Sequence, residues 1–97
     1  MSNSIDAIIL SYEKSVVLNA IYDVVDALGL IAEHINSERG VLVIRTPDKA
    51  QMRVMVDTVF PSRDTKVGIV CQDGEAYDWA SAFLDELKST LAGGYDK

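Results

Sequence analysis

The chain has 97 residues, 48% of them hydrophobic and 25% charged, so it is long enough for one folded domain and too apolar for a disordered protein. Fifteen acidic and nine basic residues give a formal net charge of -6, which disfavours nucleic acid and anionic lipid as partners. The single cysteine, Cys71, excludes an internal disulfide and the paired thiols of a zinc site.

No run of about 18 apolar residues is present, and the N-terminal stretch lacks the basic start and cleavage pattern of a secretory signal. The basic residues are scattered along the chain and form no patch. We therefore expect one soluble, cytoplasmic domain over residues 1–97, with fraying at 1–4 and 94–97, and neither a membrane nor nucleic acid as a partner.

The N-terminal segment fits two structures. It could be a helix capped by Ser4, or a short strand with Ile8, Leu10 and Tyr12 on one side. We favour the strand, because it would bring the sheet to about five members, a common size.

A helix is predicted over residues 13–28. Apolar side chains recur there at helical spacing, at Val17, Ala20, Ile21, Val24 and Leu28. Val16, Leu18 and Val25 widen this stripe beyond what one sheet can cover. Gly29 ends the helix, because glycine reaches the left-handed conformation without a Cβ penalty.

Four strands are predicted next, over residues 30–35, 41–46, 51–59 and 65–71. The first two form a hairpin around the turn "NSERG". The third shows the clearest alternation of polar and apolar residues, with one face exposed to solvent and one apolar face.

The faces of these strands matter for function. In the second strand, Val41 and Val43 lie opposite Leu42 and Ile44, so the strand is apolar on both sides. In the first, His34 is placed on the face of Ala32. Val67, Ile69 and Cys71 share a face of the last strand.

The segment "DGEAYDWASAFLDELKSTLAGG" is predicted to be a helix, with Asp73 as N-cap, Glu75 near the positive end of the helix dipole, and Gly93 and Gly94 as the stop. Its apolar stripe is Ala76, Ala80, Phe83, Leu84, Leu87 and Leu91. The chain is thus predicted to be α+β, a two-layer fold with an antiparallel sheet of four or five strands packed by two helices in the order β-α-β-β-β-β-α.

The stretch "AIYDVVDALGLIAEHINSERGVLVIR" resembles small bacterial α+β domains of the TATA-binding-protein-like or helix-grip type. These include uncharacterised families and repeated domains of an outer-membrane assembly lipoprotein. A helix ends there in a Leu-Gly pair, here Leu28 and Gly29, and a turn, here residues 36–40, leads into an aliphatic strand. This chain has no lipoprotein signal, so an envelope role is not implied, and such folds share no single activity.

Candidate chemistry is sparse. His34 and Cys71 could form an imidazole–thiol pair if their strands were neighbours, but we interpret Cys71 as a core residue and His34 as an edge or interface residue. Asp73, Glu75 and Asp78 lack the alternating ligands of a calcium loop, and helix capping explains the first two. We therefore predict no catalytic, cofactor-binding or metal site.

The arginine and aromatic side chains expected near the surface could either pack within the chain or contact a partner. Arg45 and Arg53 are expected to point outward and to be solvated or paired with Glu33 or Asp57 across strands, and nothing selects a ligand carboxylate or phosphate as their partner. Tyr77 is expected to cap the sheet end, and Trp79 either packs there or contacts another subunit.

The surplus of aliphatic side chains needs another layer to cover it. It predicts a non-enzymatic association module, an adaptor, chaperone-like or regulatory protein, that acts as a homodimer through the outer face of the sheet or the first helix and can accept a protein partner. The expected interface residues are Leu18, Tyr22, Val41, Val43, Met55 and Trp79. The alternative is a binder of a small apolar ligand, with a pocket between the sheet and the C-terminal helix lined by Val54, Val56, Ile69 and Phe83.

Overall fold

The helices and strands follow the predicted order. A computed structural model describes residues 4–71 and 76–94, with the side chains of 7–71 and 78–93. Its elements are β1 (Ser4–Leu10), α1 (Lys14–Ala27), β2 (Ile31–Asn36), β3 (Val41–Arg45), β4 (Gln51–Val59), β5 (Asp64–Cys71) and α2 (Ala76–Gly94). The α+β fold is confirmed, and the N-terminal segment is a strand rather than a helix. Of the ends predicted to fray, Ser4 begins β1 and Gly94 ends α2, and the rest lie outside the described residues.

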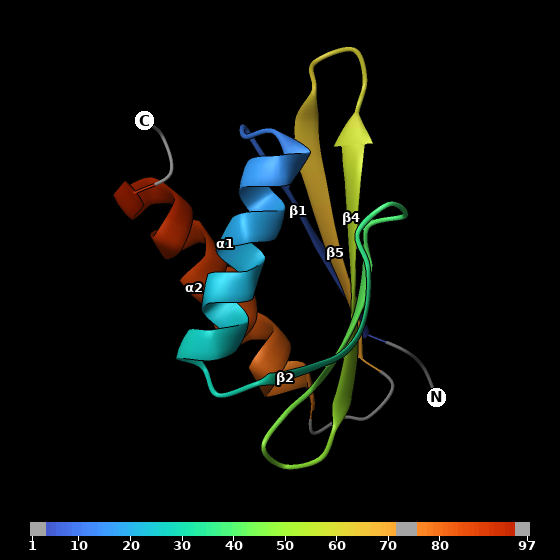
Figure 1. Cartoon of the computed structure of the whole chain (residues 1–97), viewed down its shortest axis with the longest axis vertical. Helices are drawn as coiled ribbons and strands as arrows, with labels where there is room; N and C mark the ends of the chain where they lie inside the picture. Colours follow the sequence, from blue (N-terminus) through green and yellow to red (C-terminus); the bar gives the residue numbers. More distant parts are fainter. Residues whose placement is uncertain (1–3, 72–75, 95–97) are drawn as a thin grey trace.

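The strands form one antiparallel sheet in the order β1-β5-β4-β3-β2. The first strand in sequence therefore pairs with the last, and β1 and β2 are the two edges. Figure 1 shows both helices on the same side of this sheet, where α1 and α2 also pack against each other. We call the opposite side, which neither helix covers, the open face.

Helix α1 forms because its apolar residues lie on one side. Its buried residues are Val17, Ala20, Ile21, Val24 and Val25. The helix ends as expected at Gly29, whose φ is +70°. The Gly29 amide donates to the Asp26 carbonyl at 3.2 Å and the Leu30 amide to the Val25 carbonyl at 2.9 Å, the paired bonds of a glycine-terminated helix.

Helix α2 and the covered face of the sheet complete the core. Phe83 and Leu87 of α2 are fully buried, as are Val54, Val56 and Ile69 on the central strands. The aliphatic side chains of α1 that exceed what the sheet alone could cover are partly buried here, because α1 packs against α2 as well as the sheet. Val16 and Leu18 are partly buried against the core, and Val25 is buried.

A bulge in β2 changes the face of one histidine. Ala32 pairs with Ile44, but His34 pairs with Val43, because the register shifts between Ala32 and His34. The extra residue, Glu33, reverses the alternation, so His34 shares the open face with Val43. The prediction that His34 shares the face of Ala32 is therefore wrong.

A series of two hydrogen bonds that begins at a buried threonine of β5 links this strand to the β1–α1 connection and to helix α2. Thr65, 0% exposed, donates from Oγ1 to the Tyr12 carbonyl at 2.7 Å, and the Tyr12 hydroxyl donates to the Leu91 carbonyl at 3.3 Å. These bonds join β5, the β1–α1 connection and the end of α2.

We expect Thr65→Val to lower the free energy of unfolding by about 1 to 2 kcal/mol, because the isosteric side chain removes the donor and leaves a partly buried carbonyl short of a partner. Urea titration measures the change. Thr58→Val is the matched control on the neighbouring strand, where the side chain is only half-buried. Equal losses for the two variants would mean that the hydrogen bond to Tyr12 contributes nothing.

Candidate functional site

The open face consists of outward-pointing residues in register across all five strands. One row runs from Val41 on β3 through Met55 and Gly68 to Ala7 on β1, since these residues pair in succession. The next row places Val43 beside Arg53, and Arg53 beside Val70. A row on the other side places Asp57 beside Lys66 and Lys66 beside Ile9.

Aliphatic side chains dominate the middle of this face. We call Ala7, Val41, Val43, Met55 and Val70 the open-face cluster. All except Ala7 are half-buried, because neighbouring side chains flank them on the sheet while nothing in the described chain lies above them. Ile9 and Ile31, 61% and 58% exposed, extend the apolar surface to the two edge strands. The apolar side chains of the open face therefore lie on all five strands, interrupted by Arg53 between Val43 and Val70.

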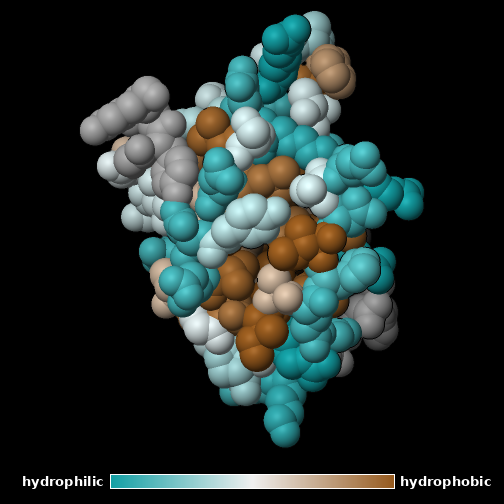
Figure 2. Space-filling view, in the orientation of Figure 1, coloured by the Kyte–Doolittle hydropathy of each residue, from teal (hydrophilic) through white to brown (hydrophobic). Residues whose placement is uncertain are grey.

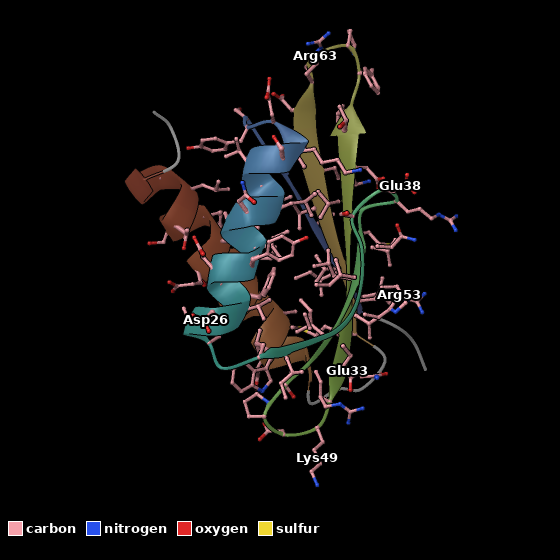
Figure 3. All side chains as sticks on the ribbon, in the orientation of Figure 1. Asp26, Glu33, Glu38, Lys49, Arg53 and Arg63 are labelled. Carbon is pink, nitrogen blue, oxygen red and sulfur yellow. The ribbon has the colours of Figure 1, made fainter. Side chains whose placement is uncertain are left out.

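The charges of the open face balance. Among the described side chains its cations are Arg45, Arg53 and Lys66, and its carboxylates are Glu33, Asp57 and Asp64. These described side chains of the face therefore carry no net charge together, whereas the whole chain carries -6. Figure 3 shows Arg53 pointing away from the helices, and its side chain is exposed between Val43 and Val70.

Glu33 is held by two partners at the β2 end of the open face. Its Oε2 accepts a hydrogen bond from Arg45 Nε, and its Oε1 accepts one from Gln51 Nε2 at 2.9 Å. The prediction that Arg45 pairs with Glu33 is confirmed. The hydrogen bonds from Arg45 and then Gln51 hold the pKa of Glu33 below its usual value, since both donors favour the ionised form.

This lowered pKa predicts a small acid dependence of stability. A carboxyl whose folded pKa is depressed contributes stability that is present above its unfolded pKa and is lost as pH falls through the folded pKa. We expect the Glu33→Gln variant to lose less stability than the wild type when the pH falls below the usual pKa of a glutamate side chain, about 4. Urea melts from neutral pH downward measure it, with Glu38→Gln at the exposed turn as control. An unchanged pH profile for Glu33→Gln would contradict the expectation.

The six predicted interface residues lie on three surfaces. Val41, Val43 and Met55 come together on the open face. Leu18, Tyr22 and Trp79 do not join them: Leu18 and Tyr22 lie on α1, and Trp79 lies at the start of α2. Trp79 packs against the core, and its Nε1 donates to Asp48 Oδ2 at 3.2 Å. The tryptophan thus joins α2 to the β3–β4 turn.

A second apolar patch lies between α1 and the edge strand β2, where Figure 2 shows hydrophobic side chains gathered near the centre of the view. Tyr22 and Ile35 are exposed there, and Leu18 and Ala32 are partly buried against the core. The patch spans one helix and one strand. Strand β2 also carries a bulge and the charge of Glu33, and both features disfavour pairing of this edge strand with a strand of another chain.

The residues considered for chemistry are not assembled into a site. Cys71 is buried on the covered face of β5, whereas His34 is exposed on the open face of β2, with β3 and β4 between the two strands. Within residues 4–71 and 76–94, no group of three or more His, Cys, Asp or Glu side chains could hold a metal. Asp78 is exposed in the first turn of α2. Asp73, Glu75 and the side chain of Tyr77 lie outside the described part.

Neither of two surface cavities matches the predicted apolar pocket. One, of about 70 Å³, lies on the open face around Arg53 and Gln51. The other, of about 330 Å³, lies between the start of α1 and the β4–β5 hairpin, and most of the residues around it are polar: Glu13, Lys14, Ser15, Thr58, Phe60 and Arg63. The four residues expected to line the apolar pocket, Val54, Val56, Ile69 and Phe83, are fully buried in the core.

Two members of the open-face cluster, Val70 and Ala7, are absent from the interface residues expected from the sequence. Val70 alternates with Ile69 and Cys71, a signal that could have placed it on the outward face. Ala7 joins the cluster through the pairing of β1 with β5, which no local pattern shows. None of the described helices is long and apolar enough to cross a membrane.

The chain matches no protein-family model and no curated protein sequence. The resemblance to helix-grip domains therefore stays a prediction, and the surface itself has to indicate the function.

Proposed function

We propose that this chain is a non-enzymatic association module, with an adaptor, chaperone-like or regulatory role, that acts as a homodimer through the open face. The observation that carries the proposal is the open-face cluster, a set of aliphatic side chains that neither helix covers. Burying apolar area of this kind contributes about 25 cal/mol per Å². A second layer would therefore stabilise a fold that is thin on its own.

Size and charge favour a second copy as the partner. Five strands spaced about 4.8 Å apart give a width of about 24 Å, and strands of five to nine residues at about 3.3 Å per residue give a height of about 16 to 30 Å. With the relief of its side chains, such a face comes near the roughly 800 Å² that each partner buries in a standard interface. Its balanced charge lets two acidic chains approach there without strong repulsion.

We also propose a cytoplasmic location, because the one cysteine of the chain is buried in the core and cannot serve an extracellular disulfide framework.

Sedimentation velocity over a wide range of protein concentrations tests the proposed function. The expected result is a species of twice the mass of the chain that dissociates only on dilution. A single species of monomer mass at every concentration would exclude the homodimer. Added apolar ligands that raise the melting temperature of such a monomer would instead favour the ligand-binding alternative.

A further inference from the structure

The two halves of the open face differ in the size and charge of their side chains, and this difference suggests how two copies would meet. The inference rests on the proposed function. Large side chains occupy one half of the central row, where Val41 on β3 is followed by Met55 on β4. The other half is nearly bare, because Gly68 on β5 is followed by Ala7 on β1. Along this row we call Val41 and Met55, the larger side chains, the ridge, and Gly68 and Ala7, the smaller ones, the hollow, although Gly68 is itself buried.

We infer that a second copy of this chain packs face to face on the open face, with the two-fold axis parallel to the strands and between β4 and β5. This operation places β4 of one copy over β5 of the other. Met55 then lies over Gly68 of the second copy, and Val41 lies over Ala7. Because the axis is two-fold, each ridge lies over the opposite hollow. Sheets packed in this way lie about 10 Å apart with strands within about 30° of each other.

The same operation pairs opposite charges. Asp57 on β4 and Lys66 on β5 are cross-strand neighbours, so exchanging the two strands puts Asp57 of each copy over Lys66 of the other. Both side chains are exposed, and no ion pair joins them among the described residues of a single chain. They are therefore available to a partner. Arg53 is placed over Val70 rather than over another Arg53, so the central cations of the two copies do not face each other.

Other two-fold arrangements fit less well. An axis along β4 would put Met55 against Met55 and Arg53 against Arg53, ridge on ridge and cation on cation. An axis across the strands through Met55 would also place the ridges in contact and leave the hollow at Gly68 and Ala7 empty. Well-packed interfaces avoid such voids, because packing density at their centres matches protein interiors.

Charge exchange between two variants tests the arrangement. We expect Asp57→Lys alone and Lys66→Asp alone each to raise the dimer dissociation constant about tenfold or more, because every copy then faces like charges across the axis. An equimolar mixture of the two variants should regain dimers, since both contacts between positions 57 and 66 of the two copies then join opposite charges. Sedimentation at several concentrations measures all three samples, and far-UV circular dichroism verifies that each variant is folded.

Cross-linking gives a second readout that does not depend on charge. A mixture of Val41→Cys and Ala7→Cys chains should be joined by a short bis-maleimide, whereas either variant alone should not. A wild-type dimer with no recovery in the charge mixture and no cross-link in the mixed cysteine sample would overturn the arrangement but keep the proposed function. A wild-type monomer would overturn both.

Discussion

Met55→Glu should convert the dimer to monomer, with a rise of about 100-fold or more in the dissociation constant, close to 3 kcal/mol. Met55 lies at the centre of the open face, beside Val41 and Gly68. A carboxylate at this position would have to lose its water on association without gaining a partner, which is costly in an apolar contact. The single chain should stay folded, because the side chain points away from the core. Sedimentation equilibrium measures the dissociation constant.

Ala82→Glu is the matched control for charge, because Ala82 is exposed on α2, on the far side of the molecule from the open face. It should leave the dimer intact. Tyr22→Glu tests the patch between α1 and β2 and should also leave the dimer intact. Dissociation by Tyr22→Glu with no effect of Met55→Glu would place the interface on α1 instead of the open face.

Gly40→Ala should be among the most destabilising single substitutions in the chain, with a loss of about 2 to 5 kcal/mol in the free energy of unfolding. Gly40 has a φ of +70°, and a Cβ added there would lie 2.0 Å from the carbonyl oxygen of Val56 on β4. The contact is with backbone, and the Gly40 carbonyl also accepts a hydrogen bond from the Val56 amide at 2.6 Å. The strands must therefore move apart to admit the methyl group. Urea or thermal melts measure the loss.

Gly29→Ala separates the two causes of the stability loss expected for Gly40→Ala, which are the positive φ and the clash with the Val56 carbonyl. Gly29 has the same φ of +70°, but nothing lies within 4 Å of a Cβ placed there. Only the conformational strain applies, so we expect a loss of about 1 to 2 kcal/mol. Similar losses at the two glycines would show that the close approach of Gly40 to Val56 is not maintained in solution.

The elements could be predicted because their side-chain patterns are local. The alternation of residues 51–59 and the helical stripe of residues 13–28 each correspond to a single element, and the observed bounds of β4 and α1 lie close to them. Gly29 ends its helix for the expected reason. The face of His34 could not be predicted, because the bulge at Glu33 follows from how β2 fits against β3 and leaves no clear mark in the sequence.

The association surface could be predicted only in part, because its residues come together through topology. Val41, Val43 and Met55 are surplus aliphatics in the sequence pattern, and they do lie together on the open face. Leu18 is surplus in the same pattern, yet the packing of α1 against both α2 and the sheet covers much of it. The hollow formed by Gly68 and Ala7 depends on β1 pairing with β5, a contact between the two ends of the chain that no local pattern contains.

Isotope-filtered NOE spectroscopy on an equimolar mixture of labelled and unlabelled chains is the sharpest test of association through the open face, since it detects only contacts between copies. Face-to-face packing predicts intermolecular signals from the methyl groups of Met55, Val43 and Val70. Signals confined to Leu18 and Ile35, or open-face methyl groups that contact only water, would rule this packing out.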